Sequence, residues 1–179
     1  DNKLNPVVNR RKYLEEEIDE KRDAFFNSVQ IGDTVKGTVK SFTFENGCAV
    51  KSIGESAFFG CSFTEISLPE GITAVEANAF KQCISLLKIT LPEGVKAIGA
   101  YAFEGCTALT TVMAMGVTEI GCGTFTGCTS LTTLELGDAL VAVGDSAFSG
   151  CTVLATFVGG KSLKSIGEGA FSGCKALVT

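Results

Sequence analysis

Apolar residues along this chain recur in a fixed order about every 22 to 23 residues. Each unit holds a phenylalanine and, three residues later, a cysteine; the pairs are Phe58 and Cys61, Phe80 and Cys83, Phe103 and Cys106, Phe125 and Cys128, Phe148 and Cys151, and Phe171 and Cys174. An aliphatic residue lies five positions before each phenylalanine, and a leucine lies three positions after each of the last five cysteines. Self-similarity at this period predicts a solenoid in which each unit buries its apolar side against the next.

One unit, LLKITLPEGVKAIGAYAFEGC at 86–106, contains every element that the pattern predicts. Its first residues alternate between apolar and polar, as in a half-buried strand, and the PEG segment then turns the chain. A second extended run, V-x-x-I, follows. The glycine after this run suits either a positive φ or a close approach to another backbone. The A-F-x-x-C segment is predicted to form a short helical or 3₁₀ turn.

These residues and spacings resemble the BspA-like class of leucine-rich repeats over residues 50–179. The resemblance implies a β-rich, right-handed leucine-rich-repeat solenoid of short strands and short helical turns, with a sheet on one face. It also implies a non-enzymatic scaffold for protein–protein interaction or adhesion, and it favours a bacterial cell surface over the cytoplasmic alternative. We therefore expect no catalytic residue and no cofactor.

Composition narrows the function further. The net charge of −5 disfavours a broad polyanion-binding surface, and no apolar run approaches the roughly 18 residues that span a bilayer. The chain contains no histidine, which excludes Cys-His and Ser-His-Asp catalysis and removes the commonest zinc ligand.

The eight cysteines allow two interpretations. The six that follow the repeat either form a disulfide framework or metal site, or they form a column of small buried thiols, one per unit. The second interpretation is favoured because the chain has no C-x-x-C pair and because free cysteine is usually buried as a hydrophobic residue. We thus expect no metal site. Cys122, beside a corner glycine, is expected to be exposed, and Cys48 lies outside the pattern.

The first 49 residues have a different character and are predicted to form a separate N-terminal domain before the repeats of 50–179. Residues 1–40 carry eight basic and eight acidic side chains. Within residues 9–30, Leu14, Ile18, Phe25 and Val29 fall near one helical face. This spacing predicts an amphipathic helix that begins near an Asn9 cap and covers the open end of the solenoid.

Residues 9–54 also resemble the connector helix and first strands of the OB-fold RNA-binding domain repeated in the largest protein of the bacterial small ribosomal subunit. The resemblance rests on NRRKYLEEE, GDTVKGTV and GCAV. It implies RNA association as an alternative function, with Lys40, Phe42 and Phe44 as the contacts. The later strands of the barrel are absent, which disfavours nucleic acid as a partner. In a second account, VKSFTF has the spacing of a repeat strand and forms a degenerate first unit, with 50–53 as its return run.

A protein partner is expected on the outward positions of the first strand of each unit. After Glu65 and Ser67, the candidate partner-binding residues are Lys88, Thr90, Thr110, Thr111, Met113, Thr132, Thr133, Glu135, Thr156 and Val158. Threonine is also common in solvated strands, so a merely solvated face is the competing interpretation. The final unit, CKALVT, stops within a strand motif; either the natural chain continues, or the last unit pairs with another molecule.

Overall fold

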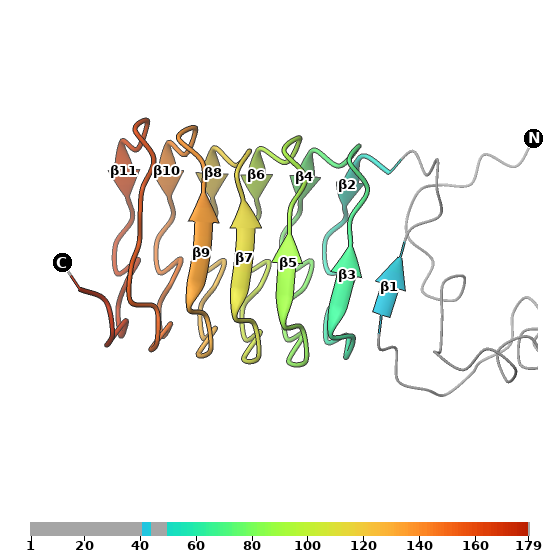
Figure 1. The fold of residues 1–179 in the computed structure, drawn as a ribbon, viewed down its shortest axis with the longest axis horizontal. Helices are drawn as coiled ribbons and strands as arrows, with labels where there is room; N and C mark the ends of the chain where they lie inside the picture. Colours follow the sequence, from blue (N-terminus) through green and yellow to red (C-terminus); the bar gives the residue numbers. More distant parts are fainter. Residues whose placement is uncertain (1–40, 44–49, 179) are drawn as a thin grey trace, which may run out of the picture.

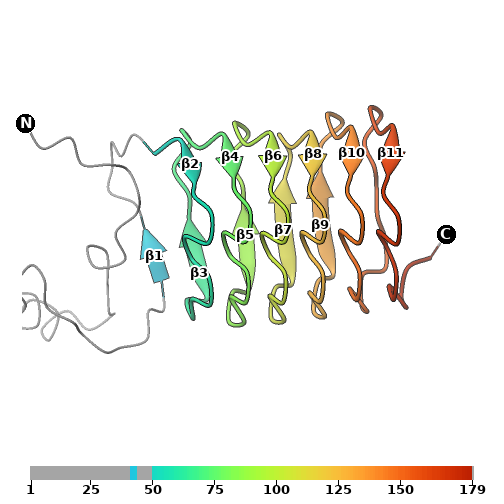
Figure 2. The ribbon, with the colours of Figure 1, turned by 180° about the vertical axis from the view of Figure 1, so that it is seen from behind.

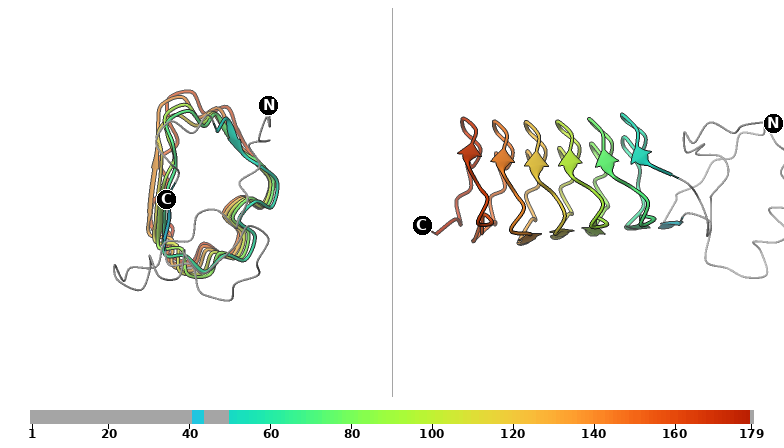
Figure 3. Two further views of the ribbon diagram at one scale, coloured as in Figure 1. Left: turned by 90° about the vertical axis from the view of Figure 1, so that its right-hand side faces the viewer. Right: turned by 90° about the horizontal axis from the view of Figure 1, so that it is seen from above.

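The repeats form a stack of rungs, where a rung is one turn of 22–23 residues. The computed structural model describes residues 41–43 and 50–178. Figure 1 shows the rungs side by side along the long axis, and the end-on view in Figure 3 superimposes them. The described residues contain eleven short strands and no helix. The predicted solenoid is therefore confirmed.

Strands lie on two faces of the stack. The first is a parallel six-stranded sheet made of β2 (Ser52–Ile53), β4 (Ala74–Val75), β6 (Ala97–Ile98), β8 (Glu119–Ile120), β10 (Ala142–Val143) and β11 (Ser165–Ile166). Figure 2 views the molecule from the side of this ladder. This six-stranded sheet confirms the second extended run, V-x-x-I. The family resemblance implies a sheet on one face only, so the structure adds a sheet on a second face.

The other face carries the longer strands. β5 (Lys88–Thr90), β7 (Thr111–Ala114) and β9 (Thr133–Leu136) form a parallel three-stranded sheet, and β1 (Ser41–Thr43) pairs in parallel with β3 (Glu65–Ser67). Each strand is paired with its counterpart one rung away. Burial alternates along β3 and β5, where a buried isoleucine lies between two exposed residues, as the L-x-x-I-x-L pattern predicts.

The pairing of β1 decides how the VKSFTF segment is used. Phe42 is in register with Ile66, which is itself buried, and β2 forms the return run that follows. The prediction of a degenerate first rung is thereby confirmed for Ser41–Thr43. The predicted N-terminal helix, its capping role and the domain assigned to 1–49 otherwise lie outside the described residues.

A column of phenylalanines runs through the interior. Successive rings from Phe58 through Phe80, Phe103, Phe125 and Phe148 to Phe171 stack with centroids 5.1–5.3 Å apart and interplanar angles of 3–12°. Neighbouring strands lie about 4.8 Å apart, a spacing that suits offset stacking of aromatic rings. An edge-on ring packs near each end, Phe63 against Phe58 and Phe157 against Phe171. The predicted alignment is confirmed.

The A-F-x-x-C segment differs from the predicted helical turn. Alternate amides bond within the rung and to the next one: Cys106 N donates to Phe103 O at 3.2 Å, whereas Phe103 N donates to Thr124 O at 2.8 Å. A helix would direct every amide along its own chain and leave the neighbouring rung unpaired. The alternation requires left-handed residues, here Tyr101 (φ 57°) and Gly105 (φ 70°). We call this segment of each rung the turn ribbon.

Four of the corner glycines, Gly99, Gly121, Gly144 and Gly167, are required by close approach and not by a positive φ. A Cβ atom on Gly121 would lie 2.7 Å from Ala100 N, and one on Gly144 would lie 2.6 Å from Cys122 N. Neither glycine has a left-handed φ. Of the two explanations that the sequence left open, the structure selects the second.

The phenylalanine column should dominate stability. Phe103 is fully buried and stacked on both sides. We expect Phe103→Ala to lower the free energy of unfolding by about 3–5 kcal/mol, measured by urea denaturation. Phe171, which is half-buried, should lose less on the same substitution, and Val158→Ala, at an exposed position, should change stability by no more than about 0.5 kcal/mol. Equal losses at Phe103 and Val158 would contradict the stacked column.

Candidate functional site

Six of the ten predicted partner-binding residues are brought together on the three-stranded sheet. Backbone register aligns Lys88 with Thr111 and Thr133, and it aligns Thr90 with Met113 and Glu135. We call these two rows the strand face. Ile89 and Val112, between the rows, point inward and are buried. The strands therefore present these six residues on one side of the sheet.

The strand face is electrically sparse. Its charged residues, Lys88 and Glu135, lie on different rows and on strands separated by β7. At its centre the exposed Met113 has its sulfur 3.7 Å from the Thr90 hydroxyl. Such a surface offers apolar and hydroxyl contacts, with little long-range attraction for a charged partner.

Thr110 and Thr132 have a structural role that the sequence interpretation missed. The Thr110 hydroxyl donates to Leu87 O at 2.9 Å, and the Thr132 hydroxyl donates to Thr110 O at 3.2 Å. Thr73 and Thr118, which directly precede β4 and β8, donate in the same way to the preceding rung. A threonine directly before a strand therefore links two rungs, a signal that could have been read from its position in the repeat.

The remaining two candidates, Thr156 and Val158, lie in a segment that does not form a strand. Phe157 stands where earlier rungs have a smaller aliphatic residue, and its ring packs against Phe148 at 5.7 Å between centroids. Gly159 replaces the inward Leu136 of the preceding rung, and a Cβ on Gly159 would meet Leu163 Cδ2. The larger Phe157 ring, and Leu163 beside Gly159, thus fill this part of the interior differently from earlier rungs. Both candidates remain solvent-exposed.

The structure bears little on the three RNA candidates. Phe42 lies in β1, in backbone register with Ile66. Lys40 and Phe44 lie outside the described residues. RNA contact at these positions stays a prediction.

The repeat cysteines line up as a second interior column. Cys83, Cys106, Cys128 and Cys151 are fully buried. Each thiol donates to the carbonyl of the phenylalanine one rung earlier, from Cys83 Sγ to Phe58 O at 3.0 Å to Cys151 Sγ to Phe125 O at 3.2 Å. The predicted column of buried thiols is confirmed at these positions. These thiols also donate hydrogen bonds, which the treatment of buried cysteine as a hydrophobic residue does not predict.

Comparison with known families agrees with this architecture. The family model for the BspA type leucine-rich repeat region matches this chain over residues 35–116 and 110–179, with six copies of the repeat. The chain belongs to this family. No curated protein matches the chain.

Several solved structures resemble this BspA-type protein over most of the stack of rungs. A leucine-rich repeat protein from T. pallidum is 28% identical, with a TM-score of 0.58 and 78% of each chain covered. A leucine-rich cell surface protein from Faecalibacterium prausnitzii is 29% identical (TM-score 0.56), and a leucine-rich repeat protein from Eubacterium ventriosum is 25% identical (TM-score 0.57). The match to the F. prausnitzii protein covers 80% of this chain and 47% of that protein. The match to the E. ventriosum protein covers 76% of this chain and 43% of that protein.

Burial suppresses ionisation of the thiol column in this BspA-type chain. Removal from water raises the pKa of Cys151 to about 12 and raises the pKa values of Cys106 and Cys128 well above their usual range. Charge on neighbouring thiols adds to this effect. The thiolate is the reactive form of cysteine, so these residues are chemically inert at neutral pH.

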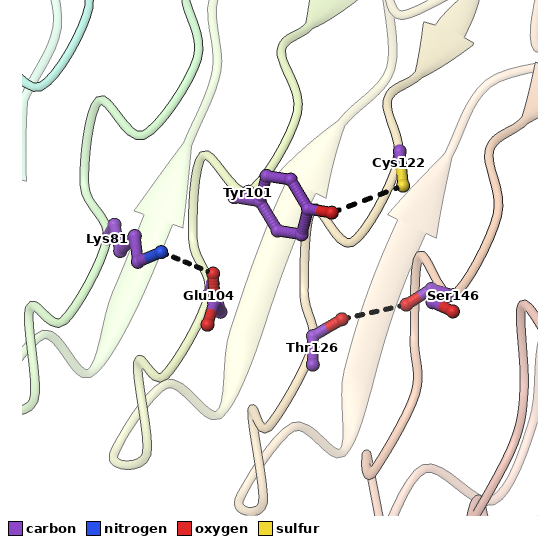
Figure 4. A network of polar contacts seen from close by, with 6 residues as sticks. All are labelled: Lys81, Tyr101, Glu104, Cys122, Thr126 and Ser146. Atoms are coloured by element: carbon purple, nitrogen blue, oxygen red, sulfur yellow. Dashed lines mark hydrogen bonds and ion pairs between the residues drawn. The ribbon is translucent and has the colours of Figure 1, made fainter.

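A polar cluster on the turn ribbon was not anticipated from the sequence. Lys81 pairs with Glu104 at 2.8 Å, and the Cys122 thiol lies 3.7 Å from the Tyr101 hydroxyl. The hydrogen bond with Cys122, and then the charge of that thiol, raises the pKa of Tyr101. Figure 4 shows Tyr101 between Lys81 and Cys122. Cys122 is half-buried, and so less accessible than expected. Aligning the rungs would have singled out Tyr101, because the equivalent residues are all small.

Two further findings concern the described part of the chain. Among residues 41–43 and 50–178, no group of three or more potential ligands could hold a metal ion. Within the same residues, no helix is long and apolar enough to cross a bilayer.

The thiols of this BspA-type chain should differ sharply in reactivity. At pH 8, iodoacetamide should alkylate the half-buried Cys122 well before the fully buried Cys151, because a pKa raised to about 12 leaves few thiolates at Cys151. Peptide mapping by mass spectrometry measures both rates on the native protein, and unfolding in urea should equalise them. Comparable native rates would contradict the buried column.

Proposed function

We propose that this chain is a protein-binding scaffold and that the strand face contacts the partner. The observation that carries the proposal is the register of its two rows, which presents Lys88, Thr111 and Thr133 beside Thr90, Met113 and Glu135 on parallel strands. Repeat proteins commonly bind partners through such extended surfaces, and the BspA-type family supports this use. The chain would act by binding and not by catalysis.

The chemistry of the strand face favours an uncharged, partly apolar partner surface. Met113 is 36% exposed at the centre, and methionine adapts its shape to irregular surfaces. The two charges lie at the margins, so association should proceed without strong electrostatic steering. Thr110 and Thr132 contribute less, because their hydroxyls already bond to the preceding rung.

A role in adhesion at a bacterial cell surface is the specific form of this proposal. It is supported by the F. prausnitzii relative, which is described as a leucine-rich cell surface protein. The identity of the partner follows from the experiment below.

A photo-crosslinking residue at position 113 tests the strand face. Placed there, it should yield discrete adducts with a protein from cells that carry the partner. The same residue at Ala97, exposed on the six-stranded sheet, is the matched control and should yield none of these adducts. Excess wild-type protein without the crosslinker should compete for the partner and suppress the adducts. The Met113→Lys variant should require at least about tenfold more protein for the same suppression. Identical adducts from both positions would contradict the proposal.

A second proposal is self-association through the last rung. Ile166 in β11 is 52% exposed, whereas its counterparts Ile98 and Ile120 are 2% exposed. β11 is the outermost strand of its sheet, with β10 as its neighbour. An exposed strand edge beside an apolar side chain can pair with another copy of the chain.

Charge at position 166 should abolish this association. Sedimentation velocity at rising concentration should detect a dimer of the 179-residue chain, and Ile166→Lys should leave a monomer. Burial of one isoleucine contributes about 1.5–3 kcal/mol, equivalent to roughly 10- to 150-fold in the dimer dissociation constant. Met115→Lys, at an exposed position in the middle of the stack, should dimerise normally. A monomeric wild type at all concentrations would reject self-association while leaving the strand-face proposal intact.

A further inference from the structure

One residue of the turn ribbon departs from its counterparts in every other rung. The position five residues before each repeat cysteine has a left-handed backbone throughout, and it is occupied by Ser56, Asn78, Tyr101, Gly123, Ser146 and Gly169. Five of these side chains are small or absent. A bulky aromatic residue at φ 57° is energetically costly, by about 1 kcal/mol or more. Strain of this kind clusters at functional sites, which directs attention to Tyr101.

The contacts of Tyr101 hold its ring in a defined place. The ring lies against Gly123 of the next rung, where a Cβ atom would collide with its Cε1. Its hydroxyl contacts Cys122, and the Lys81 ammonium lies over the ring, 5.5 Å from its centroid. The residue nevertheless remains 40% exposed. In Figure 4 the Tyr101 ring lies between Lys81 and Cys122.

The surface around the ring is polar but carries little net charge. Lys81 and Glu104 neutralise each other, with 28% and 27% of their side chains exposed. The position of Glu104 is taken by Thr126, Ser149 and Ser172 in the next three rungs. The Thr126 hydroxyl bonds to Ser146 O at 2.8 Å. Hydroxyls, glycines and one aromatic ring thus face the solvent, without the row of cations that a nucleic acid would need.

We propose that this surface, the Tyr101 platform (Tyr101, Lys81, Glu104 and Thr126), binds a neutral oligosaccharide, with one pyranose ring packed on the part of the Tyr101 ring that Lys81 and Gly123 leave exposed. The face of an aromatic ring is negatively polarised and attracts the C–H groups on the flat side of a sugar. The hydroxyls of the sugar then meet the Lys81 ammonium, the Glu104 carboxylate and the Thr126 hydroxyl oxygen, which can only accept because its proton is donated to Ser146 O. The site lies in the turn ribbon and is separate from the strand face, so either proposal can fail alone.

Saturation-transfer difference NMR tests the platform by measuring how much magnetisation passes from the full chain to a bound sugar. The probes are cellotetraose, maltotetraose and chitotetraose. At least one should bind with a dissociation constant on the order of 1 mM, as one stacked ring and a few hydrogen bonds would give. Tyr101→Asn should weaken binding about tenfold or more. It is the appropriate variant because Asn78 already occupies the equivalent left-handed position, so the backbone is preserved. Tyr101→Phe should stay within about threefold.

Fluorescence locates the contact independently. The chain has two tyrosines and no tryptophan, so Tyr13→Phe leaves Tyr101 as the sole reporter, and its emission should change in step with saturation. Met113→Lys, on the strand face, is the matched control and should bind the sugar normally. No binding of any tetrasaccharide at tens of millimolar would overturn the proposal. Unchanged sugar binding by Tyr101→Asn would also overturn it. So would binding of a proline-rich peptide at this site when none of the three sugars binds.

Discussion

The stacking of one rung on the next, at a spacing shared by backbone and side chains, is the constraint on which this structure depends. Parallel strands set a separation of about 4.8 Å, and the phenylalanine rings follow it at 5.1–5.3 Å. The thiols of the last five repeat cysteines then reach the carbonyl of the phenylalanine one rung earlier. A residue that changed this spacing would disturb both columns and the strands on both faces at once.

Because the interior contacts of one rung recur in most of the others, the exterior positions are free to differ. The strand face, the exposed Ile166 and the Tyr101 platform all consist of residues that depart from the repeat or lie outside its buried columns. Thr124 shows how narrow the interior tolerance is. It replaces an alanine at a fully buried position, and its hydroxyl is accommodated by the carbonyls of Gly99 and Gly121. Function in such a protein is therefore expected on its surface.

Much of the fold could be predicted because buried positions recur. Phe103 and Cys106 repeat at one spacing in six units, and the interior can accept little else at those positions. The surface did not follow as simply. Thr110 and Met113 looked equivalent as outward residues, yet the Thr110 hydroxyl bonds to the previous rung while Met113 remains on the face. Thr156 and Val158 fit the repeat in sequence, but Phe157 and Gly159 repack that rung.

The sequence by itself determined the period and the interior columns, because these depend on side-chain type at regular spacing. It left two accounts open for VKSFTF, and the pairing of β1 with β3 placed that strand in the stack. Only the tertiary structure decided how the rungs join. It replaced the expected helical turn with a ribbon whose amides alternate between rungs, and it assigned four of the corner glycines to close packing. It also placed Tyr101 beside Lys81 and Cys122. The physical reason is that these features are contacts between residues about 20 positions apart, whose geometry exists only after the rungs have stacked.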